Sequence, residues 1–258
     1  MKVELVDWTG KGHPDPRYGA AKLIWAKNTR VEIMAGGIEE ILKWPVERID
    51  EELTYVANTL PASWEHVVFT FVITGVTRAF THQLVRTRNV SFSQQAMQVL
   101  RMDKQDWAYH VGTTIRGKPN ANALYVDCME YIKTTHKMLM MIEGVHTEDA
   151  RGVLPTNIET NIIMTANLRA LCDLLRKRAS PRNQGARPGD EGEWTVAHRE
   201  MRARMIEVMP WTDMFLNRTA DKYAADAYML LEQVQDKKLR TEITKRIDAI
   251  LTNVGSDQ

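Results

Sequence analysis

Hydrophobic and polar residues alternate over the first positions of the chain and then follow a helical period. Lys2–Asp7 alternates and predicts a short strand. A loop rich in glycine and proline follows at Gly10–Pro16. Apolar residues then recur at helical spacing and predict helices over Tyr18–Lys27, Ile38–Lys43 and Val46–Asn58. Pro61 ends the last of these helices, because the residue before a proline is pushed out of helical geometry.

The stretch Val67–Thr74 is β-branched and aromatic and predicts the clearest strand of the chain. Gly75 bounds this strand, and an amphipathic helix is expected to begin directly after it at Val76 and to break near Asn89. From there a polar, glutamine-rich segment continues to Leu100.

The second half of the chain is dominated by helical patterns. Residues 123–143 have apolar side chains at helical spacing and predict a long helix. Asn157–Ala166 predicts another strand, although Asn161 interrupts its pattern. Further helices are expected over Asn167–Arg178, Glu193–Met209, Asp221–Gln235 and Lys238–Leu251. Residues 180–192 combine proline, glycine and charge without periodicity, which indicates a functional lid or a disordered insert. No repeat or domain boundary stands out, so a single domain is expected.

Composition limits the possible partners. The 258 residues carry a net charge of +1 and the sequence pI is about 7.8, which gives no global reason to expect nucleic acid or an anionic membrane as partner. Any anion site must therefore be local. Because we find no signal-peptide core and no apolar run of membrane-spanning length, we expect a cytoplasmic protein.

Cysteine and methionine usage gives two expectations about the core. Cys128 and Cys172 lie in apolar surroundings, which is typical of reduced, buried thiols. Most methionines lie in helical patterns, and Met138, Met140 and Met141 are expected to fill the core.

A first group of donor side chains lies where the helix after Gly75 is expected to end. Gln83 precedes Arg86 by one helical turn, and Arg88 follows at the break. Cations at a helix end are favoured by the helix dipole alone. Arg78 and His82 crowd the same segment, however, and Gln94, Gln95 and Gln98 continue it, which favours binding of a planar, anionic ligand.

A second group comprises Asn167, Arg169, Asp173 and Arg178. Arg169 and Asp173 are four residues apart on the expected helix, so spacing alone favours a surface ion pair that contributes roughly 0.3–0.5 kcal/mol. Arg151 is a single cation before a glycine. The seven histidines are scattered without metal-ligand spacing, and no metal site is expected.

Three stretches together resemble the flavin-dependent thymidylate synthases, whose signature is R-H-R, seven residues, Ser and a following Arg. The stretches are Glu65–Phe71, Gly75–Gln95 and Ala150–Arg178, and the resemblance continues at Glu193 and at Pro210 with the tryptophans after them. It covers most of residues 1–218, so residues 219–258 would be a C-terminal helical extension of the same catalytic domain.

The resemblance implies a fold, an activity and an assembly. The fold would be α+β, a mixed α/β single domain with a central sheet and long helices. The activity would be transfer of a one-carbon unit from methylenetetrahydrofolate to C5 of a pyrimidine deoxynucleoside monophosphate, by default dUMP to dTMP. FAD would supply the hydride and NADPH would reduce the flavin. The assembly would be a homotetramer with active sites shared between subunits.

The resemblance also implies roles for individual residues. FAD would contact Arg86, Thr87, Arg88, Gln94, Asn167, Leu168, Arg169 and Asp173. The nucleotide would contact Gln83, Leu84, Val85, Arg86, Gln94, Gln95, Ala96, Met97, Gln98, Arg151 and Arg178. A neighbouring subunit would donate the Gln94–Gln98 segment. Arg178 would be the catalytic residue, because it would lie at the pyrimidine and stabilise charge as N3 ionises.

The sequence departs from the family signature at several positions. Thr87 stands in place of the middle histidine, Ala96 in place of the serine and Gln98 in place of the following arginine, while Leu60 occupies the place of an upstream histidine. Two alternatives therefore remain open. The same chemistry on dCMP would give 5-methyl- or 5-hydroxymethyl-dCMP, or the chain would be a non-catalytic homologue that binds flavin or nucleotide. Arg178 favours uracil, because arginine has no acceptor for the amino group of cytosine.

Overall fold

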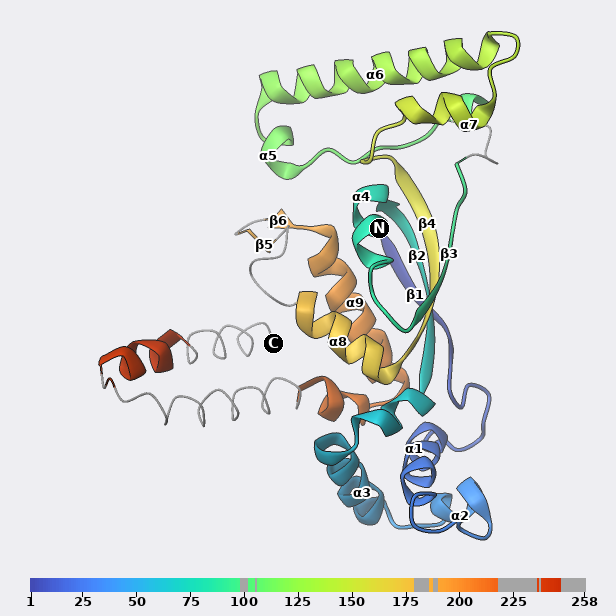
Figure 1. Cartoon of the computed structure of the whole chain (residues 1–258), viewed down its shortest axis with the longest axis vertical. Helices are drawn as coiled ribbons and strands as arrows, with labels where there is room; N and C mark the ends of the chain where they lie inside the picture. Colours follow the sequence, from blue (N-terminus) through green and yellow to red (C-terminus); the bar gives the residue numbers. More distant parts are fainter. Residues whose placement is uncertain are drawn as a thin grey trace.

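A four-stranded antiparallel sheet lies at the centre of the molecule (Figure 1). The computed structural model describes residues 1–97, 102–104, 106–178, 186–187, 190–217, 236 and 238–246. The sheet has the strand order β1-β2-β4-β3. Its strands are β1 (Lys2–Trp8), β2 (Val68–Thr77), β3 (Val90–Gln94) and β4 (Glu159–Asn167). The expected mixture of helices with a central sheet is confirmed.

Helices flank this sheet at both of its ends and on one face (Figure 1). One end carries α1 (Tyr18–Asn28), α2 (Gly37–Leu42), α3 (Val46–Thr59) and the 3-10 helix η1 (Pro61–His66). The other end carries α5 (Thr113–Arg116), α6 (Pro119–Met141), α7 (Thr147–Ala150) and the 3-10 helices η2 (Met102–Lys104) and η3 (Arg151–Val153). The helices α8 (Leu168–Arg178) and α9 (Glu193–Val208) lie side by side against the sheet.

Alternate residues of β2 form the centre of the core. Phe69, Phe71 and Ile73 are fully buried and belong to one apolar cluster with Leu171 of α8 and Met205 of α9. Each of these strand residues points to the same face, because side chains alternate along a strand. Burial of this face fixes α8 and α9 against the sheet.

The strand β2 extends further than the sequence pattern predicts. It passes Gly75, which has a φ of 63°, and Val76 and Thr77 still pair with β4 beyond a register shift. The helix α4 (Arg78–Leu84) therefore begins two residues later than the expected Val76, because these β-branched residues continue the ladder. Arg86, Thr87 and Arg88 lie in the turn after the helix. The expected break near Asn89 is confirmed by its left-handed φ of 59°.

The sequence does not predict the strand β3, because only a polar segment is expected there. In the structure Val90 and Phe92 are half-buried, whereas Ser91 and Ser93 are exposed, and the strand pairs with β4. The period-two pattern is present in the sequence, but its apolar members are too few to outweigh the serines and glutamines.

The long helix α6 forms close to where it was expected, but few of its apolar side chains are buried. Within it only Met129 and His136 are buried, whereas Leu124 and Tyr131 are each more than 70% exposed. Met138 and Met141 are exposed as well, so core filling is wrong for them. α6 lies beyond the end of the sheet (Figure 1).

The remaining expectations have mixed outcomes. Cys172 is buried as expected, and burial raises the pKa of its thiol to about 12, but Cys128 is exposed.

The strand expected from Asn157 is β4, which begins at Glu159 instead. Within the 180–192 loop, β5 (Ala186–Arg187) pairs with β6 (Asp190–Glu191). The expected helix over residues 221–235 lies outside the described residues, and of the last one only 238–246 is described, as helix. Among the helices of the described residues, none is both long enough and apolar enough to cross a bilayer.

Candidate functional site

The turn after α4 and the outer face of α8 enclose a cavity of about 640 Å³. Gln83, Arg86, Thr87, Arg88 and Asn89 line it from the first side. Asn167, Arg169, Ala170, Asp173, Leu174, Lys177 and Arg178 line it from the second. The structure therefore brings together the two donor groups that the sequence places far apart. The lining holds five cationic side chains and one carboxylate, so the cavity suits a ligand with more than one negative charge.

α4 is fixed at its start by side chains from two elements. The hydroxyl of Thr77 accepts a hydrogen bond from the Phe80 amide at 3.0 Å and thereby caps the helix. The Glu193 carboxylate accepts from both the backbone N–H and the hydroxyl of Thr77, each at 2.6 Å. These contacts tie α9 to α4 and set the direction in which the helix delivers Gln83 and the arginines.

Arg178 lies at the end of α8 and is held by two neighbours. Its Nη1 donates to Oε1 of Gln83 at 3.0 Å, and its guanidinium carbon lies 4.0 Å from the ring centroid of Trp194. Burial lowers the pKa of Arg178 from its ordinary value. An arginine still stays charged at neutral pH, so the cavity carries a partly desolvated, oriented cation.

The surface ion pair expected between Arg169 and Asp173 does not form, because each residue pairs with another one. Arg169 instead pairs with Glu65 at 2.8 Å, and Asp173 pairs with Arg176 at 3.1 Å. Asn167 caps α8, because its Oδ1 accepts from the Ala170 amide at 2.8 Å. Leu168 and Leu84 are fully buried, so their side chains pack in the core beside the cavity.

Arg151 does not line this cavity. It lies in η3, where it pairs with Glu148 at 3.4 Å. The nearby guanidinium of Arg78 has a buried Nη1 without a hydrogen-bond partner in the described part of the chain. Burial lowers the pKa of Arg78, and the positive charge of Arg151 lowers it further. The two guanidinium groups repel each other and form a second positively charged site. A bound anion there would relieve the repulsion.

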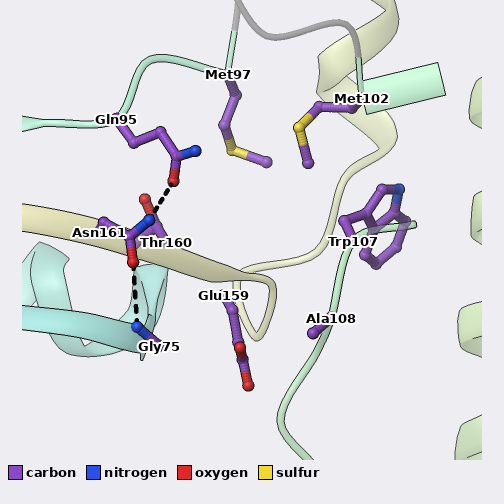
Figure 2. A pocket seen from close by; sticks show the side chains of 9 residues that line it. All are labelled: Gly75, Gln95, Met97, Met102, Trp107, Ala108, Glu159, Thr160 and Asn161. Carbon is purple, nitrogen blue, oxygen red and sulfur yellow. Dashed lines mark hydrogen bonds between the residues drawn. The ribbon is translucent and has the colours of Figure 1, made fainter. Parts of the chain in front are cut away.

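The glutamine-rich segment lies apart from the cationic cavity of this chain. Gln94 donates from Nε2 to the Thr81 hydroxyl at 2.9 Å. Gln95 and Met97 line a smaller cavity of about 200 Å³, which Figure 2 shows together with Trp107, Glu159 and Thr160. Its nine lining residues include one carboxylate and no cation, so it does not suit an anion. Ala96 is exposed, Val85 is exposed, and Gln98 lies outside the described residues.

The amide of Asn161 connects this segment to the sheet. Its Nδ2 donates to Gln95 Oε1 at 3.2 Å, while its Oδ1 accepts from the Gly75 amide at 3.1 Å (Figure 2). The chain after β3 is thereby held against β2 and β4. Among the described residues, no group of three or more His, Cys, Asp or Glu side chains gathers as a metal site.

Comparison with known proteins decides the family. A family model described as thymidylate synthase complementing protein matches residues 7–211. The chain belongs to this family. The resemblance seen in the sequence is therefore confirmed.

Three curated relatives carry the same name. A flavin-dependent thymidylate synthase of Clostridium tetani is 32% identical over 203 residues, which are 71% of this chain and 76% of that protein. One of Nitratidesulfovibrio vulgaris is 35% identical over 155 residues, 56% of this chain and 62% of that protein. One of Thermococcus onnurineus is 35% identical over 126 residues, 46% of this chain and 49% of that protein.

Three residues at these two cationic sites have no assigned ligand contact in the sequence-based prediction. Lys177 lines the cationic cavity, but cations are common in the last turn of a helix, so its position in the sequence does not single it out. Trp194 contacts both Gln83 and Arg178. The family resemblance includes this tryptophan, but the sequence does not show which residues it contacts. Arg78 was noticed only as one member of a crowded segment. Its burial without a partner is visible only in the folded chain.

Proposed function

We propose that this chain is a flavin-dependent enzyme that transfers a one-carbon unit to C5 of a pyrimidine deoxynucleoside monophosphate. The observation that carries the proposal is the cavity between the α4 turn and α8, which gathers five cationic side chains in a member of the thymidylate synthase complementing protein family. Methylenetetrahydrofolate would be the carbon donor, and NADPH would reduce the flavin.

The residues of the cavity fit FAD. A dinucleotide carries a pyrophosphate, and Arg86, Arg88 and Arg169 offer planar, multiply donating groups that match phosphate oxygens. Asp173 supplies an acceptor for hydroxyl or amino groups of the cofactor. Thr87, Asn167 and Leu168 would complete its site. Bound reduced FAD supplies the hydride for the transfer.

Arg178 and Gln83 would hold the pyrimidine. Attack through C5 requires an electron-rich ring, and a fixed guanidinium stabilises the negative charge that develops there. Charge-assisted hydrogen bonds of this kind contribute roughly 1.5–3 kcal/mol. The partial burial of Arg178 strengthens the effect, because water screens the charge less.

The substrate that these groups favour is dUMP. Arg178 offers only donors, and Gln83 Oε1 already accepts from both Arg178 and Trp194. Uracil presents a carbonyl where cytosine presents an amino group, so donors suit uracil better. The changes at Ala96 and Gln98 are the specific observation that favours dCMP as a second candidate, because they fall on the segment expected to line the nucleotide.

Arg151 would bind the nucleotide phosphate, and we add Arg78 to this site. The unpartnered Nη1 of Arg78 and the repulsion between the two guanidinium groups are both relieved by a bound anion. This second cation would compensate for the arginine that Gln98 replaces.

We also propose that the chain forms a homotetramer in which neighbours share active sites. The segment Gln94–Met97 does not line the cationic cavity of its own chain, so a second copy would have to supply it. The exposed apolar face of α6, with Leu124, Tyr131 and Met138 one heptad apart, supports self-association, because stripes of this kind are costly in water.

A product assay tests the proposal. The protein is incubated with FAD, NADPH, methylenetetrahydrofolate and either dUMP or dCMP, and the nucleotide is analysed by mass spectrometry. A methylated product from dUMP is expected. Product from dCMP alone would contradict the uracil assignment, and no product from either nucleotide would leave only a non-catalytic homologue.

A further inference from the structure

Trp194 at the start of α9 contacts both residues that the proposed function assigns to the pyrimidine. Its indole Nε1 donates to Gln83 Oε1 at 3.0 Å, and Arg178 donates to the same oxygen at 3.0 Å. The guanidinium carbon of Arg178 also lies 4.0 Å from the Trp194 ring centroid. The Gln83 oxygen therefore fixes the position of the Arg178 guanidinium, and the face of the Trp194 ring fixes its plane.

Trp194 is itself a rigid support. Its side chain is 5% exposed, and the Phe80 ring packs against it with centroids 4.4 Å apart. The preceding residue, Glu193, holds the start of α4 through its two hydrogen bonds to Thr77. The indole is thus anchored to the same helix that carries Gln83.

A support of this kind matters because arginine has many rotamers. A guanidinium that is free to move must be ordered when the ligand binds, and this ordering reduces affinity. The face of a tryptophan attracts a cation most strongly of the aromatic rings, and the attraction increases when the pair is shielded from water. Arg178 is half-buried over Trp194, so both conditions are met.

We propose that Trp194 is a positioning residue that holds Arg178, before the nucleotide binds, in the orientation that contacts the pyrimidine. The inference rests on the proposed function and deepens it. Trp194 acts through Arg178 and the shared Gln83 oxygen, and contributes nothing to flavin binding.

Two substitutions separate the parts of this role. Trp194→Phe keeps a ring under Arg178 but removes the donor to Gln83, and Trp194→Leu removes both. With FAD-loaded protein and dUMP in a calorimetric titration, we expect affinity to fall about two- to tenfold for Trp194→Phe and about ten- to 100-fold for Trp194→Leu. FAD affinity should stay within about twofold in both.

Trp211→Phe is the matched control. The indole nitrogen of Trp211 is buried without a hydrogen-bond partner among the described residues, so the substitution removes no such bond. Its dUMP affinity should equal that of the wild type. Trp194→Phe keeps the test decisive if Trp194→Leu does not fold.

A double-mutant cycle decides whether Trp194 acts through Arg178. In an Arg178→Ala background, both Trp194 substitutions should cost clearly less dUMP affinity than they do in the wild type, because only the hydrogen bond to Gln83 is then left to lose. The same loss in both backgrounds, or wild-type affinity in both single variants, would overturn the inference while leaving the proposed function intact. A wild-type protein that binds neither dUMP nor dCMP would overturn the proposed function, and this inference with it.

Discussion

At the scale of single residues, the sequence identifies donor side chains but not their partners. Gln83 and Arg178 are 95 positions apart, yet they are hydrogen bonded in the folded chain. Helical spacing suggested that Arg169 pairs with Asp173, whereas Glu65 and Arg176 are closer. Spacing along one helix reveals candidate pairs within that helix, but it is silent about competing residues from other elements. The family resemblance, rather than periodicity, assigned both donor groups to one ligand.

Arg178→Ala should reduce turnover of dUMP by roughly ten- to 150-fold, because about 1.5–3 kcal/mol of charge-assisted stabilisation is lost. FAD should remain bound, since the pyrophosphate contacts lie on other arginines. Steady-state product formation and flavin absorbance measure the two effects. Arg204→Ala, an exposed cation of α9 that pairs with Glu207, is the control and should behave as the wild type. Unchanged turnover in Arg178→Ala would remove its catalytic role.

At the scale of elements, strong periodicity was a good guide and short patterns were not. The helices α1, α3, α8 and α9 lie close to where they were expected, since each has an apolar face that packs against the sheet or its neighbours. β3 was missed because its five residues contain only two apolar ones. α6 shows a different limit: the helical period correctly predicted a helix, but it could not tell which face the rest of the chain would cover.

The buried face of α6 carries a titratable group without a partner. His136 is fully buried, and neither ring nitrogen has a hydrogen-bond partner among the residues that the structure describes. Burial lowers the pKa of His136 from its usual value of 6.5, and the nearby charge of Asp103 only partly opposes this. The unfolded chain therefore binds a proton near that pH more readily than the folded chain does, so stability should fall as the pH falls below about 6.5.

Denaturant unfolding at several pH values between about 7 and 5 measures this effect. His136→Leu should lose less stability over that range than the wild type, because the substituted residue cannot be protonated. His110→Leu, at an exposed histidine, is the comparison. Equal pH dependence in His136→Leu and the wild type would contradict the assignment.

At the scale of the whole molecule, the described chain leaves surfaces that an isolated subunit does not explain. Tyr131 and Met141 on α6 are 74% and 84% exposed, and the segment after β3 lies apart from the cavity that the resemblance assigns to it. A sequence pattern cannot separate a face buried in the core from one buried between subunits, because both require the same apolar residues. The exposed apolar side chains of α6 are therefore where we expect the proposed contact between subunits.

Replacing Tyr131 and Met138 together by glutamate should weaken self-association, because two charges would be buried at the contact. Light scattering coupled to size-exclusion chromatography should show a tetramer for the wild type and smaller species for the double variant. Lys137→Glu, an exposed charge reversal on the same helix, should remain tetrameric. A monomeric wild type, or a double variant of unchanged size, would contradict the proposed interface.

The central claim is that the cavity between the α4 turn and α8 binds FAD, and a flavin titration tests it most directly. Addition of FAD to the flavin-free protein should give saturable uptake, followed by the flavin absorbance band and by quenching of its fluorescence. Removing both Arg88 and Arg169 as alanine variants should weaken uptake by about 100-fold or more, because each charge-assisted contact contributes roughly 1.5–3 kcal/mol. Arg204→Ala should bind FAD as the wild type does. A protein that takes up no FAD, or a double variant that binds it unchanged, would contradict the account.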